Sequence, residues 1–115
     1  MPEVRVAFLS KIDDADGYRD FAQRATAMVS EEDPGTLVYN WFLSEDGTTA
    51  INEDVYDSTE SLLAHLGNMT KHGFVDEFMQ RCDVQATRVL GEVDDAARAA
   101  LAGFGAQHFE VVKSL

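Results

Sequence analysis

Three side chains in the middle of the sequence are suited to moving protons: His65, Asp54 and Tyr56. An imidazole titrates near neutral pH, so His65 is the natural candidate for a general base. Asp54 and Tyr56 are two residues apart in an extended stretch, which puts them on one face of a strand. There the carboxylate could orient the imidazole while the phenol donates to a substrate oxygen. The alternative for His65 is structural, because a lone histidine beside an apolar stripe is often hydrogen-bonded within the fold.

Aromatic side chains are available to form the walls of a pocket around these groups. Tyr39 and Trp41 alternate onto one face of a predicted strand, where they could stack against an aromatic substrate. Phe74 and Phe78 are four residues apart on a predicted helix and therefore share one side of it. The alternative for all four is simple packing in the core or in a dimer interface.

Metal and cofactor chemistry has no motif in this sequence. His65 and His72 are seven residues apart, and neither belongs to a His-x-x-x-His or Glu-x-x-His element. There is no glycine-rich phosphate loop and no nucleophile elbow, and Cys82 has no second cysteine with which to exchange a disulfide. We therefore expect neither a metal nor a cofactor.

The overall charge argues against nucleic acid and membrane partners. Nine basic and 21 acidic residues give a formal net charge of −12, which repels phosphate groups and anionic lipid headgroups. No apolar run approaches the length of a membrane span, and no export signal is visible at the start. Together with the single cysteine, these features favour a soluble protein of the cytoplasm.

The hydrophobic pattern predicts a single α+β domain over residues 1–115. Alternating apolar residues indicate strands, and apolar residues spaced by three or four indicate helices. An Asp-Gly pair at residues 46–47 predicts a tight hairpin turn. The predicted order is βαββαβ, a ferredoxin-like arrangement over about residues 3–93, followed by an extension over about 94–115. The elements are strand 4–9, helix 14–32, strands 35–44 and 48–57, helices 58–67 and 70–81, strand 84–93, helix 94–101 and strand 107–113.

The strand at 35–44 is bulky on both faces, so we expect both of its faces to be buried. Helices can cover only one face of a single sheet of this kind. An apolar face left free in the monomer needs a partner, and this predicts a homodimer.

Several short segments of the sequence resemble the antibiotic biosynthesis monooxygenase superfamily. They are E-D-P-G-T-L-V-Y at residues 32–39, D-V-Y at 54–56, A-H-L at 64–66 and, in the C-terminal extension, L-A-G-F-G at 101–105. The resemblance implies a dimeric α/β barrel. Where the superfamily has Glu-x-Tyr this chain has Asp54 and, immediately before it, Glu53, so which carboxylate faces a pocket stays open.

The resemblance also implies a range of activities. Several members oxygenate quinol or polyphenol substrates without metal or flavin, and this implies a cofactor-independent monooxygenase acting on a small aromatic, quinol-like molecule. The alternative is a non-catalytic dimeric domain that binds a small ligand or has a regulatory role. A haem-binding or haem-degrading role is disfavoured, because such a site needs Asn, Trp and His together and the neighbours Asn40 and Trp41 face opposite ways on a strand.

Overall fold

The chain forms an α+β fold in the computed structural model, which describes residues 3–115. The expected βαββαβ order is confirmed, with two helices in the second crossover and a helix and strand added at the end. In chain order the elements are β1 (Val4–Lys11), α1 (Ala15–Glu32), β2 (Thr36–Leu43), β3 (Thr49–Tyr56), α2 (Thr59–Lys71), α3 (Phe74–Arg81), β4 (Asp83–Leu90), α4 (Asp95–Ala102) and β5 (Ala106–Phe109).

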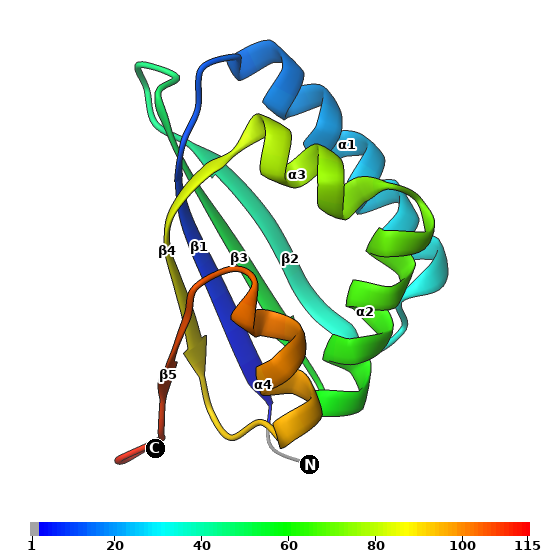
Figure 1. The fold of residues 1–115 in the computed structure, drawn as a ribbon, viewed down its shortest axis with the longest axis vertical. Helices are drawn as coiled ribbons and strands as arrows, with labels where there is room; N and C mark the ends of the chain where they lie inside the picture. The colour runs from blue at the N-terminus through cyan, green and yellow to red at the C-terminus, as the bar shows by residue number, and fades with distance from the viewer. Residues whose placement is uncertain (1–2) are drawn as a thin grey trace.

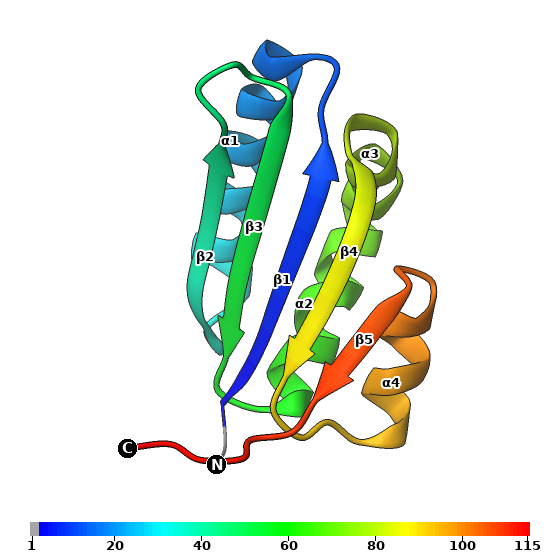
Figure 2. The same cartoon turned by 90° about the vertical axis from the view of Figure 1, so that its left-hand side faces the viewer.

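The five strands form one sheet in the order β2-β3-β1-β4-β5. The pairs among the first four strands are antiparallel, and β5 joins β4 in parallel after the α4 crossover. Figure 1 shows all four helices on the same side of this sheet. Figure 2 shows the opposite face, on which no element covers the strands.

Local capping signals explain where the helices and the hairpin begin and end. Asp14 caps α1 by accepting a hydrogen bond from the Gly17 N–H at 3.0 Å, and the Ser58 hydroxyl accepts from the Ser61 N–H at 3.1 Å at the start of α2. Pro34 follows the last turn of α1, which it cannot continue. Gly47 takes a φ of 75° in the hairpin turn, a conformation that favours glycine.

The core lies between the sheet and the helices. Alternate β1 residues Val4, Val6 and Phe8 point toward the helices, and the apolar stripe of α1 packs over the same layer. The buried hydrophobic cluster also takes in Leu101 from α4, so the C-terminal extension packs on the same core as the preceding elements.

The expectation that both faces of β2 are buried is wrong. Phe42 and Leu37 leave 50% and 52% of their surface exposed, because the sheet has helices on one face only. Regular strand alternation would put Leu37 on the same face as Tyr39 and Trp41. A register shift between Thr36 and Val38 makes Leu37 the extra residue of a β-bulge, and this separates it from the helix-covered face.

Several predicted boundaries also move. The helix expected to end at residue 67 continues to Lys71, and the next helix begins at Phe74 because Gly73 has a φ of 73°. The last two strands are shorter than expected. Gly91 has a φ of 109° and ends β4 at Leu90, so β5 has no further partner after Phe109.

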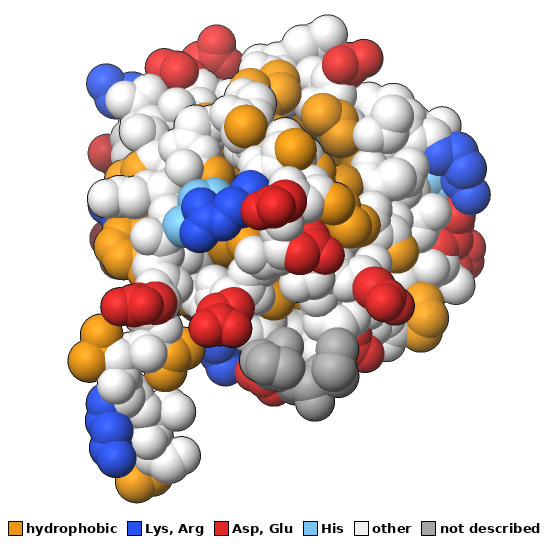
Figure 3. Space-filling view, turned by 60° about the horizontal axis from the view of Figure 1, so that its bottom comes forward, with side chains coloured by type: hydrophobic (Ala, Val, Ile, Leu, Met, Phe, Trp, Pro, Cys, Tyr) orange, Lys and Arg blue, Asp and Glu red, His pale blue; other side chains and the backbone are white. Residues whose placement is uncertain are grey.

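The surface carries its acidic side chains in a dispersed way. Figure 3 shows them scattered over one end of the molecule, from which the C-terminal tail projects beyond the body. Within residues 3–115, no helix is long and apolar enough to cross a membrane.

Leu101→Ala tests whether the extension contributes to the stability of the core. The Leu101 side chain is fully buried, so its truncation should lower the free energy of unfolding by about 2–5 kcal/mol. Val112→Ala, in the exposed tail, is the control and should change this free energy by less than about 0.5 kcal/mol. Urea denaturation followed by far-UV circular dichroism measures both, and an equally small effect of the two substitutions would contradict the expectation.

Candidate functional site

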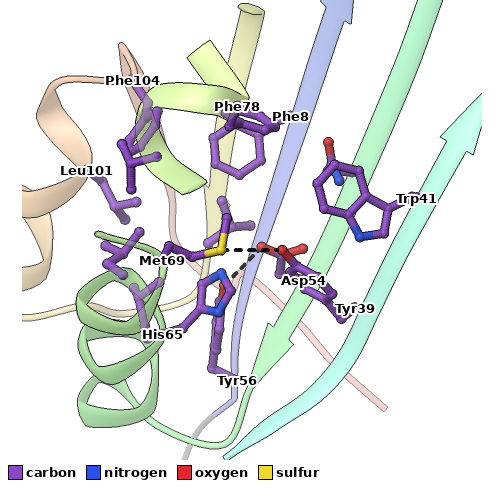
Figure 4. A pocket seen from close by; sticks show the side chains of 15 residues that line it. Phe8, Tyr39, Trp41, Asp54, Tyr56, His65, Met69, Phe78, Leu101 and Phe104 are labelled. Carbon is purple, nitrogen blue, oxygen red and sulfur yellow. Dashed lines mark hydrogen bonds between the residues drawn. The ribbon is translucent and has the colours of Figure 1, made fainter. Parts of the chain in front are cut away.

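A cavity lies between the inner face of the sheet and helices α2, α3 and α4. The centre of a water-sized sphere can reach about 40 Å³ of it, so the cavity is narrow. The space not filled by atoms in and around it amounts to about 480 Å³, part of which is open solvent. Its walls are mostly aliphatic and aromatic, with a few polar groups among them (Figure 4). The lining residues are Val6, Phe8, Tyr39, Trp41, Asn52, Asp54, Tyr56, Leu62, His65, Leu66, Met69, Val75, Phe78, Leu101 and Phe104.

Six of the seven side chains singled out in the sequence line this cavity: His65, Asp54, Tyr56, Tyr39, Trp41 and Phe78. The seventh, Phe74, is not among the lining residues. Its ring packs edge-on against Phe21 at 5.6 Å between centroids and stacks on His72 at 5.5 Å. The position of Phe74 therefore supports a packing role.

Asp54 is the carboxylate that faces the cavity. Strand alternation puts it on the helix-covered side, whereas the neighbouring Glu53 is exposed on the other side. The Tyr56 hydroxyl donates a hydrogen bond to Asp54 Oδ2 at 2.9 Å, and Asp54 Oδ1 has no partner among the described residues. The question that the sequence left open between Glu53 and Asp54 is thereby answered.

Burial determines the charge of Asp54. Removing the carboxyl group from water raises the pKa of Asp54 to about 7, although the hydrogen bond from Tyr56 acts in the opposite direction. Burial also raises the pKa of the Tyr56 phenol well above its usual value, so this hydroxyl stays protonated and remains a donor. Near neutral pH a large share of Asp54 is the neutral acid. Because Oδ2 accepts from Tyr56, the unpartnered Oδ1 is the atom free to carry the proton.

His65 is held on α2 by a carboxylate from another element. Its Nδ1 lies 2.6 Å from Asp33 Oδ2, and both side chains are buried. A neutral imidazole that donates through Nδ1–H leaves Nε2 as a free acceptor. Burial lowers the pKa of His65, and this effect outweighs the opposing influence of the Asp33 carboxyl. His65 is therefore neutral at neutral pH and able to accept a proton.

Asp33 and Asn68 are the members of this cluster that sequence reasoning missed. The Asn68 side-chain amide donates to Asp33 Oδ1 and, at 3.3 Å, to the carbonyl of Glu32. Asp33 ends α1 just before Pro34, so its position in the sequence indicated only a helix stop. The expectation that Asp54 orients the imidazole is corrected, because the observed partner of His65 is Asp33. Asn68 follows His65 by three residues, a spacing that puts both on one side of α2 and was the available signal.

Tyr39 and Trp41 form an aromatic wall on β2. The Tyr39 ring lies 5.2 Å from the His65 ring and 5.5 Å from the Trp41 ring, in edge-on contacts. The Tyr39 hydroxyl donates to Met69 Sδ at 3.8 Å, and burial raises the pKa of this phenol. In the view of Figure 4, His65 and Trp41 lie on opposite sides of Asp54.

The C-terminal extension closes another part of the cavity. Leu101 of α4 and Phe104 of the following turn both line it. The Thr87 hydroxyl donates to the Phe104 carbonyl at 2.8 Å, and the Phe104 ring packs edge-on against Phe8 at 5.6 Å. The extension therefore fixes the shape of the cavity as well as contributing to the core.

Metal-ligating side chains do not gather in the described part of the chain. No group of three or more His, Cys, Asp or Glu residues is placed to hold a metal ion there. Cys82 is buried away from the cavity lining, and burial raises the pKa of its thiol to about 12.

Comparison with known proteins finds similarity at the level of structure. No protein-family model matches the sequence, and no curated protein matches it significantly. MupZ from Pseudomonas fluorescens matches over 100% of this chain and 94% of its own, with 22% identity and a TM-score of 0.84. SnoaB, a cofactor-independent oxygenase from Streptomyces nogalater, matches over 82% of this chain and 96% of its own, with 10% identity and a TM-score of 0.68.

A third similar structure is a candidate antibiotic biosynthesis monooxygenase from Caulobacter crescentus. It matches over 80% of this chain and 91% of its own, with 19% identity and a TM-score of 0.68. At these identities the matches bear on the fold. The chain therefore shares the fold of these three proteins, among them a cofactor-independent oxygenase and a candidate antibiotic biosynthesis monooxygenase.

Proposed function

We propose that this protein is a cofactor-independent monooxygenase acting on a small aromatic, quinol-like substrate. One observation carries the proposal: His65 and Asp54 line the same largely apolar cavity, where burial lowers the pKa of His65 and raises the pKa of Asp54. A base is what a cofactor-free oxygenation requires of the protein, because a deprotonated aromatic hydroxyl can itself give an electron to dioxygen. The fold shared with SnoaB, a cofactor-independent oxygenase, supports the same activity.

In this mechanism His65 Nε2 accepts the proton of a substrate hydroxyl. The Asp33 carboxylate on the other ring nitrogen stabilises the imidazolium that forms. Asp54 Oδ1, carrying its proton, donates a hydrogen bond to a substrate oxygen, and the apolar walls strengthen both interactions by excluding water. In the overall reaction one oxygen atom is inserted into a ring C–H bond to give C–OH, and the quinol becomes a quinone. The second oxygen atom leaves as water with the two hydrogens that the phenolic hydroxyl groups lose.

A second candidate is a proton-transfer reaction that consumes no oxygen, such as an isomerisation. The observation that favours it is the pairing itself, because an acid and a base in one cavity suit a substrate that must gain and lose a proton. Oxygen uptake separates the two candidates. Binding without any turnover would instead favour a ligand-binding domain.

Haem fits this cavity poorly. Asn40 and Trp41 do lie on opposite faces of β2, but Asn52 pairs with Trp41 across the strands, so the cavity contains Asn, Trp and His together. This overturns the sequence argument against a haem site. However, the cavity lining contains no Lys or Arg to meet the haem propionates, and the Asp54 carboxyl is already difficult to ionise there.

We also propose that the protein works as a homodimer through the uncovered face of the sheet. Cross-strand pairing aligns Phe42, Ile51 and Leu9 in one apolar row on this face, with Phe42 and Ile51 about half exposed. A parallel row carries Glu53 on β3 and Arg88 on β4, either side of β1. A two-fold axis that runs parallel to β1 between two facing sheets would place Glu53 of one copy opposite Arg88 of the other.

His65→Ala tests the role of the base. Oxygen uptake with 1,4-dihydroxynaphthalene and related quinols should fall by about 100-fold or more, because the substrate hydroxyl loses its proton acceptor. His72→Ala, a half-exposed histidine seven residues further on, should stay within about twofold of the wild type. Equal activity of the two variants would remove His65 from the mechanism. The absence of oxygen uptake by the wild type with every quinol would refute the oxygenase function itself.

Asp54→Asn tests whether burial makes this carboxyl group a neutral acid. The folded protein keeps a proton that the unfolded chain releases between about pH 4 and pH 7, so the Asp54 contribution to stability is lost as pH rises through this range. Between pH 4 and pH 8, the free energy of unfolding of the wild type should fall relative to the variant by on the order of 4 kcal/mol.

Urea denaturation at a series of pH values measures this difference. Glu53→Gln removes the exposed carboxyl group next to Asp54 on the strand and serves as the control for a change of charge. The free energy of unfolding could instead change with pH in the same way for the wild type and for Asp54→Asn. That outcome would show that burial does not raise the pKa of Asp54 in the folded protein.

Ile51→Asp tests the dimer. The wild type should elute at twice the chain mass of 12.7 kDa in size-exclusion chromatography with light scattering, and the variant at the mass of one chain. Buried in an interface, the new carboxylate would have no partner of opposite charge next to it in the apolar row. Met79→Asp places the same charge at a similarly exposed apolar residue on α3, on the helix side, and should leave the dimer intact. A monomeric wild type at micromolar concentration would refute the dimer.

A further inference from the structure

Two polar groups beside the acid–base pair have no hydrogen-bond partner among residues 3–115. They are Trp41 Nε1 and Asn52 Oδ1, and both atoms are buried in residues that line the cavity. Asn52 Oδ1 accepts no hydrogen bond from any described residue, although only 3% of Asn52 is exposed. A buried amide that held the fold together would bond to the backbone, so its position calls for another explanation.

The pairing of β2 with β3 brings these two groups together. Trp41 and Asn52 are opposite each other in the register, and both face the cavity. Asn52 precedes Asp54 by two residues on the same strand, which separates their Cα atoms by about 6.6 Å. Two oxygens on opposite carbons of a six-membered ring span a distance of the same order. In Figure 4, Trp41 lies on the side of Asp54 away from His65.

The chemistry of the two groups identifies what would satisfy them. The indole N–H of Trp41 can only donate a hydrogen bond, and the free amide oxygen of Asn52 can only accept one. A carbonyl oxygen would satisfy the indole alone. A hydroxyl group accepts from the indole and donates to the amide, so one hydroxyl satisfies both atoms.

We infer that Trp41 and Asn52 form a subsite for a second hydroxyl group of the ligand, about one six-membered ring away from the oxygen that meets Asp54 and His65. This inference rests on the proposed function for the identity of the first oxygen. The ligand class is thus a ring or short chain with oxygens at both ends and an apolar middle. The aliphatic and aromatic walls between the two polar ends fit that middle.

A pair of probe ligands of the same shape tests the subsite. In 1,4-dihydroxybenzene a hydroxyl takes the place of the methyl group of 4-methylphenol, and their dissociation constants can be measured by isothermal titration calorimetry under nitrogen. Quenching of Trp41, the single tryptophan of the chain, reports binding in this cavity. The wild type should bind the dihydroxy probe about tenfold more tightly or better, because the methyl group leaves both polar atoms unpaired.

Asn52→Leu keeps the approximate size of the side chain and removes the amide. The preference between the two probes should fall several-fold, because the hydroxyl keeps its bond from the Trp41 indole but loses the acceptor for its own proton. The affinity for 4-methylphenol should stay within about threefold. The melting temperature should stay the same or rise, because the ligand-free protein no longer buries an unpaired amide. A fall in melting temperature would indicate a structural role for Asn52. A preference near one in the wild type, or an unchanged preference in the variant, would overturn the inference.

The result is independent of the test of the proposed function. Loss of turnover in His65→Ala with an unchanged probe preference in Asn52→Leu would retain the acid–base mechanism and reject the subsite. A several-fold fall of the preference in Asn52→Leu, in a protein that turns over no quinol, would retain the subsite and reject the oxygenase.

Discussion

The hydrogen bond between Asp33 and His65 is the interaction on which the candidate site depends. It joins the end of α1 to the middle of α2, and Asn68 holds the other oxygen of the same carboxylate. By occupying Nδ1 it fixes the tautomer that leaves Nε2 free, and by anchoring the ring it sets the direction of that free nitrogen. Asp33 is a positioning residue in this arrangement, since it is absent from the cavity lining and would act on a ligand only through His65.

The sequence predicted the parts of the fold that depend on local pattern. Alternation along β3 correctly put Asp54 and Tyr56 on one face, and the Asp-Gly turn correctly marked the hairpin. Features that depend on distant partners were missed. Asp33 reads as a helix stop until α2 packs beside it, and Asn52 is a neighbour of Trp41 only through the strand register. The burial of β2 was overestimated because a sequence pattern cannot show that one face of the sheet lacks a cover.

The C-terminal extension adds a helix and a strand to the βαββαβ core. MupZ matches the whole chain, whereas SnoaB and the Caulobacter crescentus protein match about four fifths of it. Leu101 and Phe104 from that segment line the cavity. An addition outside the βαββαβ core therefore sets the space available to a ligand, while the polar groups come from β2, β3 and α2. Shape and chemistry can thus change separately in proteins with this fold.

Exclusion of water acts on the acid and the base in opposite directions. It raises the pKa of Asp54 and lowers the pKa of His65, so both groups favour their neutral forms. If the proton were transferred directly from Asp54 to His65, two charges would be created in an apolar cavity, which is unfavourable. A ligand hydroxyl that gives its proton to His65 also creates two charges, but Asp54 keeps its proton and stabilises the ligand anion by a hydrogen bond, while Asp33 stabilises the imidazolium. The same desolvation that keeps the empty site neutral therefore makes proton transfer depend on a ligand that contacts both groups. Any substitution that admits water should therefore bring the pKa of Asp54 and the pKa of His65 back toward their usual values together.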